Sequence, residues 1–394
     1  MDGGMSRKDL YNAVYDRLTI FFPEQPWIKA IEKYGNNPPA HTLGESFISY
    51  GLFIFHTKGL DSCDEYDRNA LAEAFFYTQK ILELYNRIEA SKKAHYKARF
   101  KAAFEASNDM RALAFETFVY FTLVHYGWNV DCKDDRDAGE TYDYLACRDE
   151  NRVEVECKSF SYDKGLVISS GEAQKLASGI LNNFTATYEQ SKKQLSIVTI
   201  KVIEKLPQNP VMLAKVCTEI CEHISSGQNI QREKYSVTTE VHFDVPDIPN
   251  GAPSIIPVKS SDMELLCMMP QTTGDDSVTC LRITTISTNA SWREFEKTCK
   301  DAAKKQLTKV NPGVIVVHVS NLDAISAMLR DGRLRLKINN IFNQPHLVEI
   351  ILVSNSGVYE RDKYPYLELR PYIRSFTNDR SEFEWKIKLF SSKE

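Results

Sequence analysis

The chain has 394 residues, of which 43% are hydrophobic and 26% charged, the composition of a globular protein with two or three domains. Its formal net charge of −4 excludes a histone-like nucleic-acid binder, although an enzyme with one local basic cleft is compatible with it. The N-terminal stretch MDGGMSRKDL lacks the apolar core of a signal peptide, and the longest apolar run, YGLFIF, is far shorter than a membrane span.

The nine cysteines are scattered without a CxxC pair, which favours free thiols in a reducing cytosol over a disulfide framework. We therefore expect a cytoplasmic protein without a membrane partner. Cys217, Cys221 and His223 come nearest to a zinc cluster, but no fourth ligand is close in sequence, so we interpret both cysteines as core residues. The sequence has no phosphate-binding glycine loop, HExxH or GxSxG motif, which excludes several further enzyme classes.

Residues 1–107 predict an all-helical N-terminal domain. Apolar residues recur at helical spacing from Tyr66 to Ala106 without a proline or glycine, which predicts one long helix. Within this run, the segment KKAHYKARFK gathers basic residues around two aromatic ones. Such a cluster is either a solvated helix face or a phosphate-binding face, and in the second case Lys92, Lys93 and Lys97 contact nucleic acid.

A second predicted domain covers residues 108–394. The run RALAFETFVYFTLVHYGWNV predicts a helix that ends near Gly127, because it is apolar up to a glycine. The pattern then changes to period two, and WNVDC, TYDYLAC and RVEVECKS predict three strands joined as a meander. A helix over 171–193 and the apolar strand LSIVTIKV follow. The order is α-β-β-β-α-β over a core of 109–202 with a mixed sheet.

Residues from about 206 to 285 predict an insertion in that domain. The helix VMLAKVCTEICEHI and the strands YSVTTEVHFDV and TCLRITTIS belong to it, with a proline-rich loop between the strands. Residues 286–394 return to α/β elements, with the helix SWREFEKTCKDAAKKQL and the strands GVIVVHVS and HLVEIILVS. The tail segments YLELRPYI and FEWKIKLF predict edge strands or a covering hairpin.

Acidic residues and a lysine gather on the predicted meander. In RVEVECKS the valines alternate with Glu154, Glu156 and Lys158, so these three polar side chains share one face of the strand. Asp143 lies on the neighbouring antiparallel strand, close enough for its carboxylate to approach that of Glu156. Two carboxylates so close repel each other, and a hard divalent cation such as Mg²⁺ or Mn²⁺ relieves the repulsion. Lys158 could then orient or deprotonate an attacking water.

These residues and the order of elements resemble the PD-(D/E)xK endonuclease superfamily, which has the restriction-endonuclease-like fold. The resemblance covers about a quarter of the chain and rests on YDY with Asp143 and on VECKS. It implies that Asp143 and Glu156 ligate the metal, that Cys157 offers only its backbone carbonyl, and that Lys158 serves the water. Glu116, on the preceding helix, matches the position of an additional glutamate found in many members. The proline of the family motif is replaced by Tyr142.

Further polar residues carry weaker signals. Gln174 and Lys175, early in the predicted helix over 171–193, match a place where such enzymes often put a supporting polar residue. Glu154 shares the face of Glu156 and leaves open which glutamate binds metal first, although the spacing to the lysine favours Glu156. His125 and His318 lie within apolar elements, and we interpret both as structural.

The sequence thus predicts a Mg²⁺- or Mn²⁺-dependent endonuclease that hydrolyses DNA. Restriction or anti-phage defence, a partner protein of such a system and self-association are contexts that the family resemblance suggests. Two alternatives remain open at this point. One is a catalytically inactive nucleic-acid-binding or scaffolding subunit, and the other is a nuclease that acts on RNA.

Overall fold

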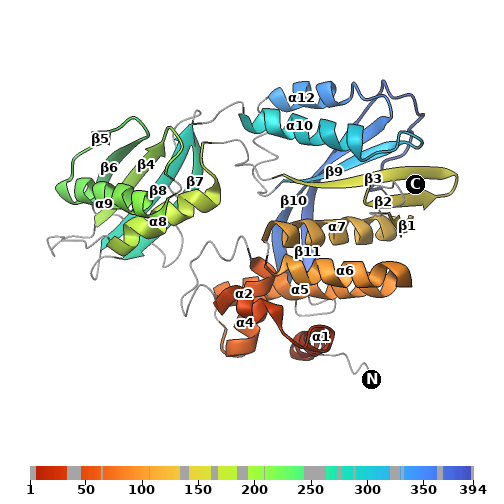
Figure 1. The fold of residues 1–394 in the computed structure, drawn as a ribbon, viewed down its shortest axis with the longest axis horizontal. Helices are drawn as coiled ribbons and strands as arrows, with labels where there is room; N and C mark the ends of the chain where they lie inside the picture. Colours follow the sequence, from red (N-terminus) through yellow and green to blue (C-terminus); the bar gives the residue numbers. More distant parts are fainter. Residues whose placement is uncertain are drawn as a thin grey trace. The chain divides into compact units, whose positions relative to one another are not determined.

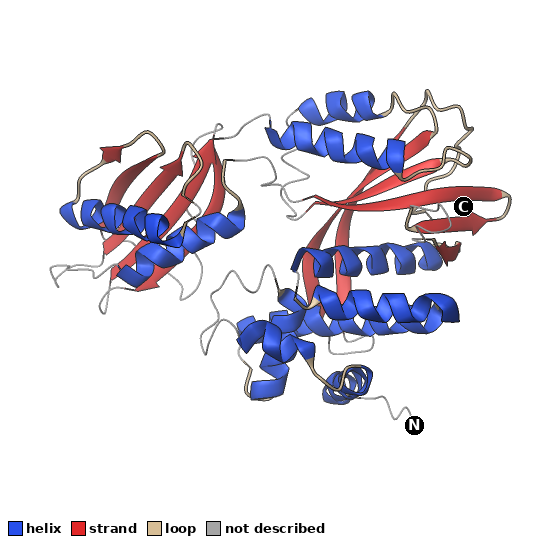
Figure 2. Cartoon of the chain, in the orientation of Figure 1, coloured by secondary structure: helices blue, strands red, loops and turns tan. Residues whose placement is uncertain are grey.

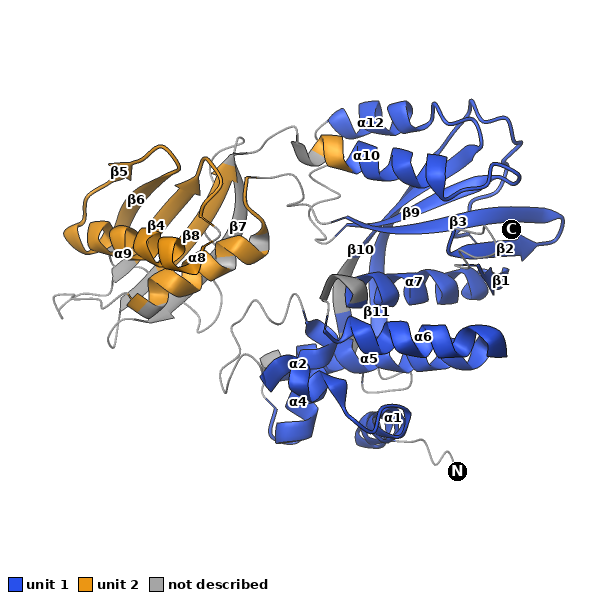
Figure 3. Ribbon diagram, in the orientation of Figure 1, with its two compact units in different colours: residues 1–162, 295–394 blue, residues 163–294 orange. Residues whose placement is uncertain are grey.

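The protein is a mixed α/β chain that divides into two compact units (Figures 2 and 3). Unit 1 comprises residues 1–162 and 295–394, and unit 2 comprises residues 163–294. None of the helices that the structure describes is both long enough and apolar enough to cross a membrane. The computed structural model describes residues 6–32, 46–63, 65–105, 107–133, 142–160, 167–183, 194–207, 209–243, 263–272, 277–286, 290–319, 329, 332–361 and 367–391.

Unit 1 is built on a six-stranded mixed sheet. Its strands, in spatial order, are β1 (Asn129–Cys132), β2 (Tyr144–Arg148), β3 (Asn151–Phe160), β9 (Gly313–Val319), β10 (Leu347–Glu360) and β11 (Leu367–Thr377). The first three form the predicted antiparallel meander, β3, β9 and β10 run parallel, and β11 returns antiparallel. Helix α7 (Ser107–His125) packs on one face, and α10 (Ala290–Lys305) and α12 (Arg333–Ile341) lie on the other (Figure 1).

The predicted core over 109–202 is wrong in its last two elements. The strand beside β3 is β9, with Glu156 opposite Ile315 and Lys158 opposite Val317. The strand predicted over 195–202 does form, as β4 (Gln194–Val202), but it pairs with strands of unit 2. In unit 1 the elements α7, β1, β2 and β3 are followed by α10 and β9, and the segment that forms unit 2 is 163–294, longer than the insertion predicted from about 206 to 285.

The N-terminal helices share a hydrophobic core with the sheet of unit 1, which corrects the predicted boundary at residue 107. Buried residues of these helices form one cluster with Val358 of β10 and Leu367 of β11. The long helix predicted from Tyr66 to Ala106 is interrupted at Glu89, whose backbone is extended (φ −57°, ψ 148°). The helices are α1 (Arg7–Phe21), α2 (Pro26–Glu32), α4 (Phe47–Lys58), α5 (Glu65–Arg87) and α6 (Ala90–Ala103).

Unit 2 has a five-stranded sheet with α8 (Ser170–Asn183) and α9 (Pro210–Ser226) packed against it (Figure 1). The strand order is β5 (Ile230–Gln231), β6 (Tyr235–Phe243), β4, β8 (Ser277–Ile286) and β7 (Met263–Thr272). The Asn209 side chain caps α9 by accepting from the amide of Val211 at 2.9 Å. Cys217 and Cys221 are buried in the core between helices and sheet, which confirms their interpretation as core residues.

The C-terminal segment 378–391 returns across unit 1 without forming a strand, so the strand predicted for FEWKIKLF is wrong. Its carbonyls accept from side chains of the meander region, Leu389 from Trp128 Nε1 and Ser391 from Arg148 Nη1, both at 2.9 Å. Glu349 of β10, which is fully buried, accepts from the amide of Leu389 at 3.1 Å. Hydrogen bonds to fixed side chains thus replace the ladder that an edge strand would have made.

The buried Glu349 carboxyl makes the stability of unit 1 depend on pH. Burial raises its pKa to about 7, from 4.5 for an ordinary glutamate. Between these two values the folded state keeps a proton that the unfolded state has released, so stability falls as pH rises, by at most about 1.4 kcal/mol per pH unit. We expect the stability of Glu349→Gln relative to wild type to increase from pH 5 to 7 and to level off by pH 8.

Urea denaturation at pH 5, 6, 7 and 8 measures this difference. Glu382→Gln, at an exposed position of the same C-terminal segment, is the matched control and should track the wild type at each pH. A difference between Glu349→Gln and wild type that stays constant over the whole range would contradict the prediction.

Candidate functional site

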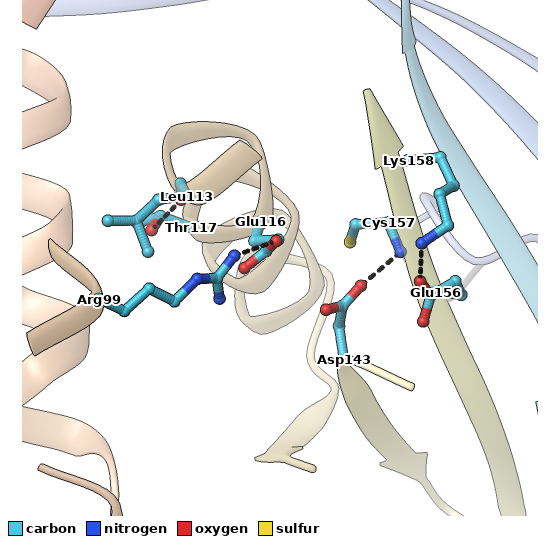
Figure 4. A network of polar contacts seen from close by, with 8 residues as sticks. All are labelled: Arg99, Leu113, Glu116, Thr117, Asp143, Glu156, Cys157 and Lys158. Carbon is cyan, nitrogen blue, oxygen red and sulfur yellow. Dashed lines mark hydrogen bonds and ion pairs between the residues drawn. The ribbon is translucent and has the colours of Figure 1, made fainter. Parts of the chain in front are cut away.

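Asp143 lies directly before the start of β2 and contacts β3. Tyr144 is paired with Val155, so Asp143, one residue before the strand, lies across from Glu156. Its Oδ2 atom accepts a hydrogen bond from the backbone amide of Cys157 at 2.6 Å. The Asp143 side chain therefore continues the β2–β3 pairing by one further contact and is held against the part of β3 that carries Glu156 and Lys158 (Figure 4).

Glu156 and Lys158 form an ion pair on one face of β3. The Lys158 ammonium contacts Oε1 of Glu156, as the period of two along a strand allows for residues i and i+2 (Figure 4). Glu156 is 1% exposed, whereas the Lys158 side chain is 24% exposed. Asp143 thus lies beside the stretch of β3 that carries Glu156 and Lys158, with the Glu156 carboxylate buried and the Lys158 ammonium nearer to solvent.

Glu116 joins this group from α7. Its Oε1 atom lies 2.6 Å from Nη2 of Arg99, a residue of α6, so helices before and after residue 107 contribute to the same cluster. In Figure 4 the Glu116 carboxylate lies between the Arg99 guanidinium and Asp143. Arg99 belongs to the basic segment of the sequence, but its pairing with Glu116 could not be read from spacing, because the two residues lie on different helices.

Electrostatic repulsion among these carboxylates is large. The pKa of Asp143 is raised well above its usual value, first by burial and then by the neighbouring Glu156 and Glu116 carboxylates. Burial alone would lower the pKa of Lys158, but Glu156 and Asp143 raise it overall, so Lys158 carries a proton in this state. Burial likewise raises the pKa of the Cys157 thiol, which excludes a thiolate at this position. A protonated lysine suits charge stabilisation better than proton abstraction.

The donor set suits a hard divalent cation. Asp143 and Glu156 offer carboxylate oxygens, and Cys157 could add a carbonyl oxygen. The described residues contain no group of three or more histidine, cysteine, aspartate and glutamate side chains arranged to enclose a metal ion.

Glu154, on the same face of β3, has a different environment. It is fully buried and accepts hydrogen bonds from the amide and hydroxyl of Thr308 and, at 3.0 Å, from Nδ2 of Asn311. These partners lie in the segment between α10 and β9. Glu154 thus anchors that segment to β3, and its oxygens are occupied, which favours Glu156 as the metal-binding glutamate.

The three lysines predicted to contact nucleic acid make contacts within the chain. Lys92 donates to the carbonyl oxygen of Cys132 in β1. The Lys93 ammonium lies 5.2 Å from the centre of the Tyr85 ring, and that of Lys97 lies 4.6 Å from the centre of the Phe21 ring. These contacts give the basic face of α6 a structural role, and its contact with nucleic acid stays a prediction.

The remaining predicted residues lie on other elements. Gln174 and Lys175 are in α8 of unit 2, while α10 takes the place in unit 1 that the sequence assigned to their helix. His318 stacks on the Phe115 ring, with centres 5.1 Å apart, and burial lowers its pKa to about 4, as expected of a structural histidine. His125, at the end of α7, packs edge-on against Tyr126.

Comparison with known proteins gives no family. No protein-family model matches the chain, and neither do curated proteins nor solved structures. A function for this cluster has to be argued from its geometry and chemistry.

Proposed function

We propose that the protein is a divalent-metal-dependent nuclease that hydrolyses phosphodiester bonds of DNA. The observation that carries the proposal is the convergence of Asp143, Glu156 and Lys158 at the junction of β2 and β3. The order α7-β1-β2-β3-α10-β9, once residues 163–294 are taken as an insertion, supports a restriction-endonuclease-like core in unit 1. The topology around the motif thus supports the proposal beside the motif itself.

The residues have distinct roles in this proposal. Asp143, Glu156 and the Cys157 carbonyl would hold Mg²⁺ or Mn²⁺, which supplies Lewis acidity and an activated water. Lys158, protonated and partly exposed, would place its positive charge beside the phosphate oxygens, where negative charge increases during hydrolysis. The buried position of Glu156 keeps its carboxylate fixed and limits competing water, so the phosphate would approach from the more exposed lysine side.

Cleavage of defined nucleic acids tests the function. The purified full-length protein is incubated with supercoiled plasmid, linear duplex, single-stranded DNA and RNA, each with Mg²⁺, Mn²⁺ or EDTA. We expect cleavage of DNA that requires the metal, is abolished by EDTA, and falls at least ~10²-fold in Asp143→Asn. Asparagine preserves the shape and can still accept from the Cys157 amide, so this variant should fold.

The results with the different substrates distinguish a DNA nuclease from an RNA nuclease and from a non-catalytic subunit. Cleavage of RNA alone would replace DNA with RNA as the substrate. Metal-dependent binding of nucleic acid without cleavage would favour a non-catalytic subunit of the same fold. Cleavage that persists in EDTA or in Asp143→Asn would contradict the proposed site.

A further inference from the structure

The ion pair between α6 and α7 bears on how many metal ions the site can hold. Arg99 and Glu116 approach to 2.6 Å, and their side chains are 29% and 13% exposed. Because the pair is partly shielded from water, the guanidinium charge acts on Glu116 more strongly than a surface pair would. A guanidinium also stays protonated at any physiological pH, so this positive charge is permanent.

Two of the three carboxylates at the site have cationic partners. Glu116 contacts Arg99, and Glu156 contacts Lys158. The hydrogen bond that the structure gives Asp143 comes instead from a neutral group, the amide of Cys157. Among the described residues, no cationic side chain contacts Asp143, so the carboxylate without a cationic partner is the one beside β3.

We propose that Arg99 takes the place of a second cation beside Glu116, so that the site accepts a single divalent ion, at Asp143 and Glu156. The inference rests on the proposed metal-dependent function and makes Arg99 a positioning residue, which acts through Glu116. It also reassigns Glu116, which the sequence predicts as a metal ligand, to the partner of an arginine. Arg99 lies on α6, so its pairing with Glu116 depends on the packing of α6 beside α7.

The charge balance agrees with one ion. Three carboxylates against the ammonium of Lys158 and the guanidinium of Arg99 leave one negative charge at the site. One divalent cation together with one phosphodiester anion brings this set of groups to neutrality. A second divalent cation would leave two positive charges in a largely buried place, next to an arginine that repels it.

Counting bound Mn²⁺ tests the inference without nucleic acid and without reference to cleavage. Calorimetric titration, with electron paramagnetic resonance of the free ion, gives the number of ions bound to the full-length protein. We expect one ion in the wild type and in Arg99→Lys, which keeps the charge, and two in Arg99→Met. The double variant Arg99→Met with Glu116→Gln should return to one ion, bound less than about tenfold more weakly than in the wild type.

A matched control comes from the same helix. Lys101 of α6 pairs with Glu24, also at 2.6 Å but with both side chains largely exposed. Lys101→Met should bind one ion, as the wild type does. If Arg99→Met fails to fold, Arg99→Lys and the double variant, which removes both charges together, carry the test.

Several results would overturn the inference. A single ion bound to folded Arg99→Met would show that Arg99 does not exclude a second ion. Two ions bound to the wild type would show that Arg99 does not take the place of the second ion. A loss of affinity well above tenfold in the double variant would make Glu116 a ligand of the first ion. These outcomes leave the proposed nuclease function in place, whereas absence of Mn²⁺ binding in the wild type would overturn both.

Discussion

Glu156→Gln and Lys158→Ala are both expected to impair DNA cleavage severely, but for different reasons. A neutral amide is a poorer ligand for a hard dication, so Glu156→Gln should lose Mn²⁺ binding and cleavage together. Lys158→Ala should retain Mn²⁺ and DNA and cleave at least ~10²-fold more slowly, the usual cost of a lost charge-stabilising group. Calorimetry with Mn²⁺ and single-turnover cleavage of a labelled duplex separate binding from chemistry.

The chain contains a matched control for this pair. Glu384 and Lys386 have the same residue types, the same spacing and the same ion-pair contact as Glu156 and Lys158, but their side chains are 75% and 80% exposed. Glu384→Gln and Lys386→Ala should therefore leave Mn²⁺ binding and cleavage unchanged. Full cleavage by Glu156→Gln or by Lys158→Ala would rule out this site as the nuclease centre.

Glu154→Ala is expected to destabilise unit 1 and to loosen the segment that precedes β9. It removes the acceptor for the Thr308 amide, the Thr308 hydroxyl and the Asn311 amide group, and it leaves a cavity beneath the segment that precedes β9. Thr308 is exposed, so its donors can turn to water when Glu154 is removed, and we expect a loss of about 1–3 kcal/mol. Urea denaturation of the metal-free protein measures it.

Two companion variants define the cause. Glu150→Ala, at an exposed position in the turn before β3, should change stability by less than about 0.5 kcal/mol. Thr308→Ala combined with Glu154→Ala should destabilise less than the sum of the single changes, because both remove the same contact. Strictly additive effects would show that Glu154 and Thr308 are not coupled.

The local elements of unit 1 and the pairing within its meander could be predicted from the sequence, but the strand on the other side of β3 could not. Alternation in RVEVECKS and the apolar run of α7 specify a strand and a helix through nearest neighbours, and both form. After β3, the chain offers two successive pairs of a helix and an apolar strand, α8 with β4 and α10 with β9. Both pairs satisfy the same periodicity, and only packing against α7 and β10 distinguishes the pair that belongs beside β3.

The site shows the same limit at the scale of single residues. The period of two along a strand places Glu154 and Glu156 on one face of β3, but by itself it does not show which of the two binds metal. What separates them in the structure is the distant Thr308, which occupies the Glu154 carboxylate, whereas Glu156 pairs with Lys158 two residues away. The basic segment of α6 was likewise visible as a cluster of charge, whereas its partners, such as Glu116 for Arg99, depend on how α6 packs against α7.

The insertion of unit 2 between β3 and α10 has a consequence for synthesis of the protein. About 150 residues separate the end of β3 from the start of β9, its parallel neighbour in the sheet. At roughly 5–20 residues per second, a ribosome needs about 10–30 s to make that stretch, and β3 has an open edge throughout. The valines of β3 are then exposed to other nascent chains, so chaperones that hold unpaired strands should matter more for this half of the protein than for unit 2, whose strands follow one another closely.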